Sequence, residues 1–299
     1  MPEKLKIAEG THYFGRTGIP ITIRRVKTNP QHMDSHPHDL TEVEHCHDFC
    51  ELTFVTRGSA LHCLEGNDFP ITAGDVFLLQ GKQLHYFHQR KNLELINVMY
   101  DPQKVGLPES ELRTMPGYCA MFLLEPNYRR QHRFASRLHV KRFQLGQLEQ
   151  MANIMEQEST KKNPGYEVAL RAKLLEMIVY LSRAYINAET IESYALLRVS
   201  NVISALENNF SKHWTLTDLQ AIAHMSRSNL MRVFRKGTGQ SPIEYLLRLR
   251  IQKSMELLRN TDLPITEIAM EIGFRDSNYY ARQFRRTTGK SPRIFRRHG

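Results

Sequence analysis

The chain has 299 residues, which is enough for two domains that each bury a core. Its formal charge of +10 is confined to one end, because residues 195–299 hold 18 Lys and Arg against 8 Asp and Glu, whereas residues 1–194 hold 23 of each. The start has no apolar core like that of a signal peptide, and no apolar run reaches membrane-spanning length. We therefore expect a cytoplasmic protein with no membrane partner.

The four cysteines favour the same compartment. Cys46, Cys50, Cys63 and Cys119 lie in the neutral part of the chain at irregular spacing. This spacing argues against a disulfide framework, and it is typical of a protein from a reducing environment.

Residues 20–101 have the pattern of an all-β domain. Short apolar stretches alternate with turn sequences such as 66–68 and 73–75. The pattern predicts strands over residues 19–26, 51–56, 60–65, 68–72, 76–79, 84–88 and 93–100. Strands of this length and spacing are typical of a small antiparallel barrel or a double-sheet jelly roll. We expect this β-domain to occupy residues 1–137.

The hydrophobic period changes to three and four residues over 138–186. The break Asn163-Pro-Gly165 divides this stretch into an antiparallel helix pair. One pair cannot bury two apolar stripes alone, so we expect it both to pack on the barrel and to form a dimer seam. The polar residues 187–194 are the expected linker to a third part, residues 195–299.

Residues 195–299 are predicted to be all-α, and they contain one helical unit twice. The first copy runs over residues 216–242 and the second over residues 265–292. Arg232 matches Arg282, Phe234 matches Phe284, and Gly-x-Ser-Pro ends both copies. Helices are expected over 197–209, 217–224, 228–236, 243–259, 266–272, 277–288 and 292–297. A duplicated helix-turn-helix in the basic part of the chain indicates a protein that reads double-stranded DNA.

The early residues of the second helix in each unit are the candidates for reading base edges. We expect Ser226 and Asp276 to cap these helices. The inward residues are then Leu230, Val233, Phe234, Tyr280 and Phe284. The residues expected to face bases are Ser228, Asn229, Met231 and Arg232 in the first unit, and Ser277, Asn278, Ala281 and Arg282 in the second. Arg235, Lys236, Arg285, Arg286 and Lys290 are the expected phosphate contacts.

The repeat, the long helix that joins its copies and the pattern Gly-Phe-x4-Tyr-x4-Phe-Arg-x3-Gly-x-Ser-Pro over residues 273–292 resemble the AraC/XylS family of bacterial transcription regulators. The resemblance covers about residues 200–297. It implies that the two recognition helices enter successive major-groove segments on one face of DNA. It also implies a homodimer, and an activator that works beside RNA polymerase.

The β-domain holds a candidate metal or effector cluster. His45, His47 and Glu51, followed by 70–75 and His85, resemble the two cupin motifs. Residues at i and i+2 on a strand point the same way. Three histidines and one carboxylate suit a divalent transition metal, which favours a metal-sensing regulator or a metal-dependent cupin fused to a DNA-binding module. The alternative is a patch used for packing or for hydrogen bonds to a ligand, with no cofactor required. Further histidines precede the cluster, at 32, 36 and 38.

Within the family, residues 44–52, together with Arg57-Gly58, residues 71–75 and His85, most resemble the rhamnose-responsive activators. That resemblance implies a small sugar effector in the barrel, with the segment before residue 20 folded over it. Arg57, His85 and Tyr86 align with positions at which the arabinose regulator holds its sugar. We expect these three residues, together with His45, His47 and Glu51, to bind the effector. No Ser-His-Asp arrangement or phosphate loop is present, so we expect no enzyme.

Overall fold

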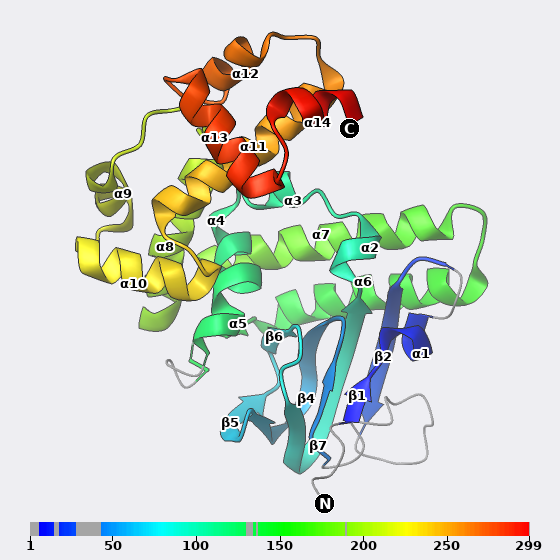
Figure 1. Ribbon diagram of the computed structural model, residues 1–299. Coiled ribbons are helices and arrows are strands. Elements are labelled where there is room, and N and C mark those ends of the chain that lie inside the picture. The colour runs from blue at the N-terminus through cyan, green and yellow to red at the C-terminus, as the bar shows by residue number, and fades with distance from the viewer. Residues whose placement is uncertain are drawn as a thin grey trace, which may run out of the picture. The chain divides into compact units, whose positions relative to one another are not determined.

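The computed structural model describes residues 6–14, 18–27, 43–129, 134–135, 137–188 and 190–298 (Figure 1). The chain forms two compact units. Unit 1 comprises residues 1–109 and 120–196, and unit 2 comprises residues 110–119 and 197–299. The sequence-based division at 187–194 differs from this in one important respect, because ten residues within the N-terminal part pack in the C-terminal unit. Among the described residues, no helix is both long and apolar enough to span a membrane.

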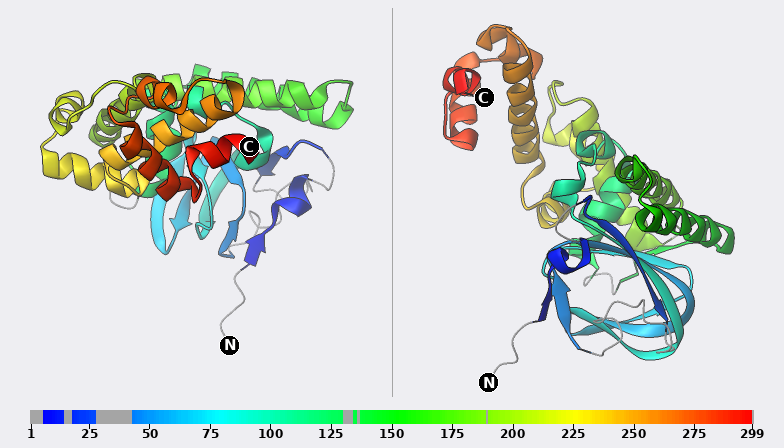
Figure 2. Two further views of the ribbon diagram at one scale, coloured as in Figure 1. Left: turned by 45° about the horizontal axis from the view of Figure 1, so that its top comes forward. Right: turned by 90° about the vertical axis from the view of Figure 1, so that its right-hand side faces the viewer.

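Unit 1 is built on one curved sheet of eight strands (Figure 2). The strands are β1 (Lys6–Ala8), β2 (Ile21–Lys27), β3 (His45–His47), β4 (Cys50–Leu64), β5 (Asn67–Thr72), β6 (Asp75–Leu79), β7 (His85–Tyr100) and β8 (Leu138–His139). The order is β1-β3-β7-β4-β6-β8, and β2 pairs with β7 while β5 pairs with β4. Every pair is antiparallel except β1 with β3. The β-rich fold class predicted for the N-terminal part is confirmed.

Two long strands replace four predicted short ones. The predicted strands at 51–56 and 60–65 form one strand, β4, and those at 84–88 and 93–100 form β7. The pairing of these strands shifts register between Val55 and Leu61, so a series of bulges takes the place of the break expected between residues 56 and 60. Gly58 adopts φ 73° there, and a Cβ atom on it would lie 2.2 Å from the carbonyl oxygen of Asn92. Only glycine permits this close approach of the two backbones.

Helices complete unit 1. They are α1 (Gly10–Phe14), α2 (Pro102–Val105), α5 (Glu125–Tyr128), α6 (Arg142–Lys161) and α7 (Tyr166–Ile186), together with the π-helix η1 (Cys119–Leu124), which begins at the last residue of the inserted segment. The pair α6 and α7 matches the helix pair predicted over 138–186. Arg25 Nε of β2 donates to Glu156 Oε2 of α6 at 3.0 Å, which ties the pair to the sheet. Phe143 of α6 and Val168 of α7 remain 66% and 69% exposed.

Unit 2 is all-α, as predicted. Its helices are α4 (Pro116–Tyr118), α9 (Leu216–Ala223), α10 (Arg227–Thr238), α11 (Pro242–Asn260), α12 (Ile265–Glu271), α13 (Ser277–Thr288) and α14 (Pro292–His298). Two helices cross the division between the units, α3 (Glu109–Leu112) and α8 (Ile191–Asn208). The start of α8 lies six residues before the predicted start, inside the predicted linker. Thr190 Oγ1 accepts a hydrogen bond from the amide of Ser193 at 3.1 Å, which gives the helix a polar start there.

Candidate functional sites

The first helix-turn-helix unit is formed by α9 and α10. The side chain of Ser226 accepts a hydrogen bond from the amide of Asn229 at 3.4 Å and caps α10. The residues predicted to point inward, Leu230, Val233 and Phe234, are buried. On the other face Ser228 and Arg232 are exposed, and Asn229 and Met231 are half-buried. Arg232 Nη2 donates to Asn229 Oδ1 at 2.8 Å, so the side chains suited to guanine and adenine lie side by side.

The second helix-turn-helix unit, formed by α12 and α13, has the same arrangement but different side-chain contacts. Asp276 caps α13 by accepting a hydrogen bond from the amide of Asn278 at 2.8 Å. The buried residues are Tyr280 and Phe284. The predicted base-facing residues Ser277, Asn278, Ala281 and Arg282 are all exposed or half-buried. The guanidinium of Arg282 lies 5.9 Å from the centre of the Tyr279 ring, whereas its counterpart Arg232 contacts an asparagine.

The predicted phosphate contacts lie around the last turns of these helices. The five side chains are exposed: Arg235, Lys236, Arg285, Arg286 and Lys290. Arg235 Nη2 lies 3.7 Å from Glu244 Oε2, in an ion pair that is more than half exposed. Such a pair contributes little, so Arg235 can exchange it for a phosphate.

Two exposed side chains at the starts of the recognition helices escaped the sequence-based prediction. Arg227 is the first residue of α10, and Tyr279 is 39% exposed in the first turn of α13. Both occupy the part of the helix whose side chains contact base edges in helix-turn-helix proteins. The signal that would have found them is the position of each N-cap, because the first turn of a helix has no preceding turn to cover it.

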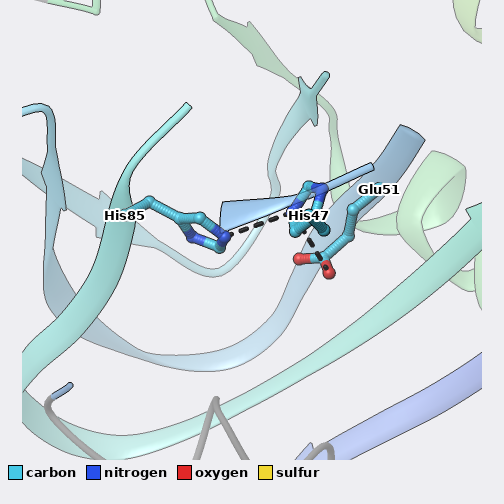
Figure 3. Close-up of side chains that lie close together, drawn as sticks. All are labelled: His47, Glu51 and His85. Atoms are coloured by element: carbon cyan, nitrogen blue, oxygen red, sulfur yellow. Dashed lines mark hydrogen bonds and ion pairs between the residues drawn. The ribbon is translucent and has the colours of Figure 1, made fainter. Parts of the chain in front are cut away.

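The buried cluster of unit 1 forms where β3, β4 and β7 meet (Figure 3). His45 pairs with His85 across β3 and β7. Nε2 of His47 lies 3.2 Å from Nε2 of His85 and 3.8 Å from Glu51 Oε2. The side chains of His45, His47, Glu51 and His85 are fully buried. The structure thus brings together all four predicted cluster residues.

Hydrogen bonds to backbone carbonyls fix the tautomers of two of these histidines. Nδ1 of His47 lies 3.0 Å from the carbonyl oxygen of Phe49, and Nδ1 of His45 lies 3.1 Å from that of Val43. A carbonyl only accepts, so Nδ1 carries the hydrogen in both rings and the neutral ring keeps its lone pair on Nε2. His85 Nε2 then donates to His47 Nε2.

The same geometry fits a metal ion at three of the four residues. One ligand atom each from His47, Glu51 and His85 lies within 4.8 Å of the others, and His45 falls outside this group although its ring centre is 4.4 Å from that of His85. Two nitrogens 3.2 Å apart can share one ion at ordinary bond lengths with an angle of about 100°. A carbonyl on the far nitrogen of a ligating histidine is the usual support for such a bond.

His62 joins the cluster although it was not predicted. Its ring lies 5.0 Å from that of Phe77, 4.7 Å from that of Phe87 and 5.6 Å from that of His85. Burial, reinforced by the charge of Arg129, lowers the pKa of His62 well below its ordinary value. The alternation of β4 would have placed it inward, because Ala60, His62 and Leu64 lie on one side of the strand.

Two predicted effector-binding residues lie apart from this cluster. The Arg57 side chain is 72% exposed and its Nη1 is 3.8 Å from Glu94 Oε1. Tyr86 follows His85 on β7 and therefore faces the other side of the sheet, where its pKa is raised, chiefly by a hydrogen bond with Cys63. The histidines at 32, 36 and 38 lie outside the described residues.

Two adjoining cavities lie beside α1. One of about 450 Å³ is lined by β2 and by residues of the helix pair. The other, of about 620 Å³, is lined by Asp48, Glu167 and Arg171 among others, and both cavities include the ring of Phe14. Residues of α1 together with Gly18 and Ile19 thus border open space large enough for a small molecule.

Comparisons with known proteins match both parts of the chain. Residues 34–139 match the model of the AraC-like ligand binding domain, and residues 219–298 match a helix-turn-helix domain. The "HTH-type transcriptional activator RhaR" of Enterobacter sp. (strain 638) is 29% identical over 289 residues, which are 96% of this chain and 94% of that protein. The protein of the same name from Salmonella schwarzengrund is 29% identical over 264 residues, 88% and 89% of the two chains.

Two solved structures of DNA-binding or C-terminal domains match about a third of the chain. The DNA-binding domain of AdpA in complex with a target DNA is 30% identical with a TM-score of 0.33, and the match covers 33% of this chain and 90% of that one. The C-terminal domain of AraT from Geobacillus stearothermophilus is 31% identical with a TM-score of 0.33, covering 34% and 85%.

Proposed function

The chain belongs to the AraC family of DNA-binding transcription regulators, with an effector-binding N-terminal domain, and we propose that it is an activator controlled by a small sugar. The observation that carries the DNA-binding part is the pair of capped helices α10 and α13. Each presents an exposed arginine and an asparagine beside a fully buried aromatic residue. The name of the RhaR relatives supports the activating role.

The two recognition helices differ, so they should read different base sequences. The residues proposed for base contact are Ser228, Asn229, Met231 and Arg232 in α10, and Ser277, Asn278, Ala281 and Arg282 in α13. Met231 and Ala281 differ most in size and reach. A binding site for one protomer is therefore expected to contain two unlike segments about one helical turn apart.

Selection of bound duplexes from a random pool tests DNA reading directly. The full chain should enrich one sequence with two protected segments, and Arg282→Ala should lose discrimination at one segment only. Enrichment of no sequence, or equal loss at both segments, would refute the assignment of α10 and α13 as separate reading helices.

A sugar effector can be held at either of two places in unit 1. The buried cluster supplies polar groups, but its side chains are fully buried and already contact one another. The cavity of about 620 Å³ offers the carboxylates of Asp48 and Glu167, the guanidinium of Arg171 and the ring of Phe14. Paired polar groups beside an aromatic ring suit a sugar, because hydroxyls need donors and acceptors while the C–H face stacks on the ring.

A thermal-shift screen of the full chain against monosaccharides identifies the effector, because a ligand that binds the folded state raises its stability. Glu167→Gln should abolish the shift if the cavity holds the sugar, and His85→Ala should abolish it if the cluster does. Arg57→Ala tests the remaining prediction from alignment. A shift that all three variants retain would place the sugar elsewhere.

The dimer, the RNA polymerase partner and the absence of enzymatic activity also stay proposals. The exposed Phe143 and Val168 on the helix pair support a dimer seam. Phe143→Glu should then shift the chain toward the monomer in sedimentation equilibrium, and an unchanged association constant would remove this residue from the seam.

A cytoplasmic location is proposed because a regulator has to reach the DNA it reads.

A divalent transition metal is the second candidate ligand, favoured by the distance of 3.2 Å between His47 Nε2 and His85 Nε2. Those two nitrogens and a Glu51 oxygen would hold the ion, which would supply a Lewis acid or a sensing site. Elemental analysis of protein purified without chelator tests this. Less than about a tenth of an equivalent excludes it, and His85→Ala should lose any bound metal whereas His88→Ala, on the same strand, should keep it.

A further inference from the structure

The segment Ser110–Cys119 is continuous with the N-terminal domain in sequence but packs in the DNA-binding unit. The chain therefore passes between the two units three times, at 109/110, at 119/120 and at 196/197. A single linker at 187–194 would leave the units joined once. The packing of residues 110–119 in unit 2 needs an explanation, because a surface loop of unit 1 would ordinarily pack on unit 1.

Inside unit 2 the segment is held by polar contacts to α8. The carbonyl oxygen of Thr114 accepts hydrogen bonds from Ser204 Oγ and from Asn208 Nδ2. Cys119 Sγ donates to the carbonyl oxygen of Arg113 at 3.1 Å, which closes the segment on itself. The side chains of Leu112 and Tyr118 in this segment are buried.

Tyr245, near the start of α11, connects the segment to the first recognition helix. Arg113 Nη1 donates to the Tyr245 hydroxyl at 3.4 Å, and that hydroxyl donates to Glu207 Oε1. Burial raises the pKa of both Tyr245 and Glu207, in keeping with the enclosed position of this group. The ring of Tyr245 lies edge-on to the ring of Phe234, with centres 5.6 Å apart. Phe234 is a fully buried residue of α10.

Among the described residues, none of these hydrogen bonds and ring contacts joins the segment to α12 or α13, the second helix-turn-helix unit. Its core lies at the other end of α11, where Tyr280 and Phe284 pack with Ile251, Leu258 and Ile268. The hydrogen bonds of the segment described above lie on α8 and the start of α11. Any displacement of the segment should act on α10 before it acts on α13.

On both sides of the segment the chain is held in unit 1 by hydrogen bonds. Upstream, β7 carries His85 and ends at Tyr100, and the next residue, Asp101, donates its amide to the carbonyl of Pro20 at 3.1 Å. Downstream, η1 leads to Arg129, whose Nη2 donates to the carbonyl of Leu78 on β6 and pairs with Glu125 at 2.6 Å. A π-helix at such a position is typical of functional sites. The segment is therefore continuous at both ends with parts of the chain that are hydrogen-bonded in unit 1, which gives a shift of β6 or β7 a covalent route to it.

We propose that Ser110–Cys119 transmits the state of the N-terminal domain to the first helix-turn-helix unit through Arg113, Tyr245 and Phe234. The second helix-turn-helix unit, α12 and α13, is left unaffected. This rests on the proposed function, in which an effector in unit 1 controls DNA binding by unit 2. Coupling of this kind requires an element whose arrangement both sites influence.

Hydrogen exchange of the full chain tests the path without DNA or effector. Arg113→Met and Tyr245→Phe should each speed amide exchange in α10 by about fivefold or more and leave α13 unchanged. Arg198→Met, which removes an exposed arginine of α8, is the matched control and should change neither helix. Unchanged exchange in α10, or equal acceleration in α10 and α13, would overturn the proposal.

A double-mutant cycle tests transmission from unit 1. Thr53 Oγ1 lies 3.0 Å from Asn97 Oδ1 of β7 and 3.3 Å from Glu51 Oε1, and Thr53→Val removes the hydroxyl that donates to them at nearly constant volume. The variant should alter exchange over 110–119 and in α10, and at least half of the α10 effect should vanish in the Arg113→Met background. An undiminished effect there overturns the path. Failure to select any DNA sequence would refute the proposed function instead, and it would leave this result standing.

Discussion

The buried His62 makes a sharp prediction about acid stability. Its ring is fully buried between Phe77 and Phe87, and its two ring nitrogens have no hydrogen-bond partner among the described residues. Protonation would place a charge in an apolar site that also feels the Arg129 charge, so the pKa of this ring is well below its ordinary value in the folded protein. The unfolded chain binds the proton at the ordinary histidine pKa of about 6.5.

The sign and size of the effect follow from this difference. A histidine whose pKa falls on folding costs no stability above pH 6.5, and it costs progressively more as the pH falls below that value. If the ring stays neutral in the folded state, the penalty at pH 5 is about 2 kcal/mol, and at pH 7.5 it is below about 0.1 kcal/mol. His62→Leu should abolish this part of the pH dependence. The wild type should therefore lose about 2 kcal/mol more than the variant between pH 7.5 and 5.

The measurement is denaturant unfolding of the full chain at both pH values, followed by circular dichroism. The single tryptophan, Trp214, lies in unit 2, so its fluorescence reports that unit separately and should show no such difference. His213→Leu removes an exposed histidine and is the control. Equal pH dependence of wild type and His62→Leu would refute the reasoning, because it would mean that His62 protonates in the folded state at its ordinary pKa.

Three further predictions concern both units. Arg282→Ala should weaken binding to a selected DNA site by about 1–3 kcal/mol with little effect on binding to random duplex. Arg286→Ala should weaken binding to both duplexes equally and lower the salt dependence of binding by about one phosphate contact. The same loss on both duplexes for Arg282→Ala would contradict base reading. Gly66→Ala, at φ 76° in open space, should cost about 1 kcal/mol, and Gly58→Ala clearly more in the same unfolding assay, because its Cβ would lie 2.2 Å from a backbone oxygen. Burial raises the pKa of Glu207, so this residue costs the folded state stability as the pH rises above the pKa of the unfolded chain. The stability of Glu207→Gln relative to wild type should therefore increase between pH 5 and pH 8. A stability difference that is the same at both pH values would refute this.

The helix-turn-helix units were predictable because their signals are local. Ser226 and Asp276 precede apolar residues at helical spacing, and the caps, the buried aromatic residues and the exposed arginines lie where that spacing puts them. Capping and amphipathic periodicity act over a single turn of helix, so no distant residue has to be known. The inward direction of His45 and His47 followed in the same way from strand alternation.

The predicted effector residues depend on more than local patterns. Arg57 and Tyr86 were assigned by alignment to the same place as His85, whereas the Arg57 side chain is 72% exposed and Tyr86, next to His85 on β7, faces the other side of the sheet; their role in effector binding stays a prediction. Strand continuity through Gly58 depends on how closely the backbone around Asn92 approaches, which is a contact between residues far apart in the chain. No turn rule applied to the sequence gives that distance.

The sequence by itself determined the two-part organisation, the confinement of the charge to the DNA-reading part, the two unlike recognition helices and the histidine pair of β3. These depend on composition and on periods of two and of 3.6 residues, which each segment carries alone. Only the tertiary structure decided that His62 joins the cluster and that Ser110–Cys119 packs in unit 2. Those outcomes depend on strand register and on which surface buries a short segment best, and both are set by residues distant in sequence.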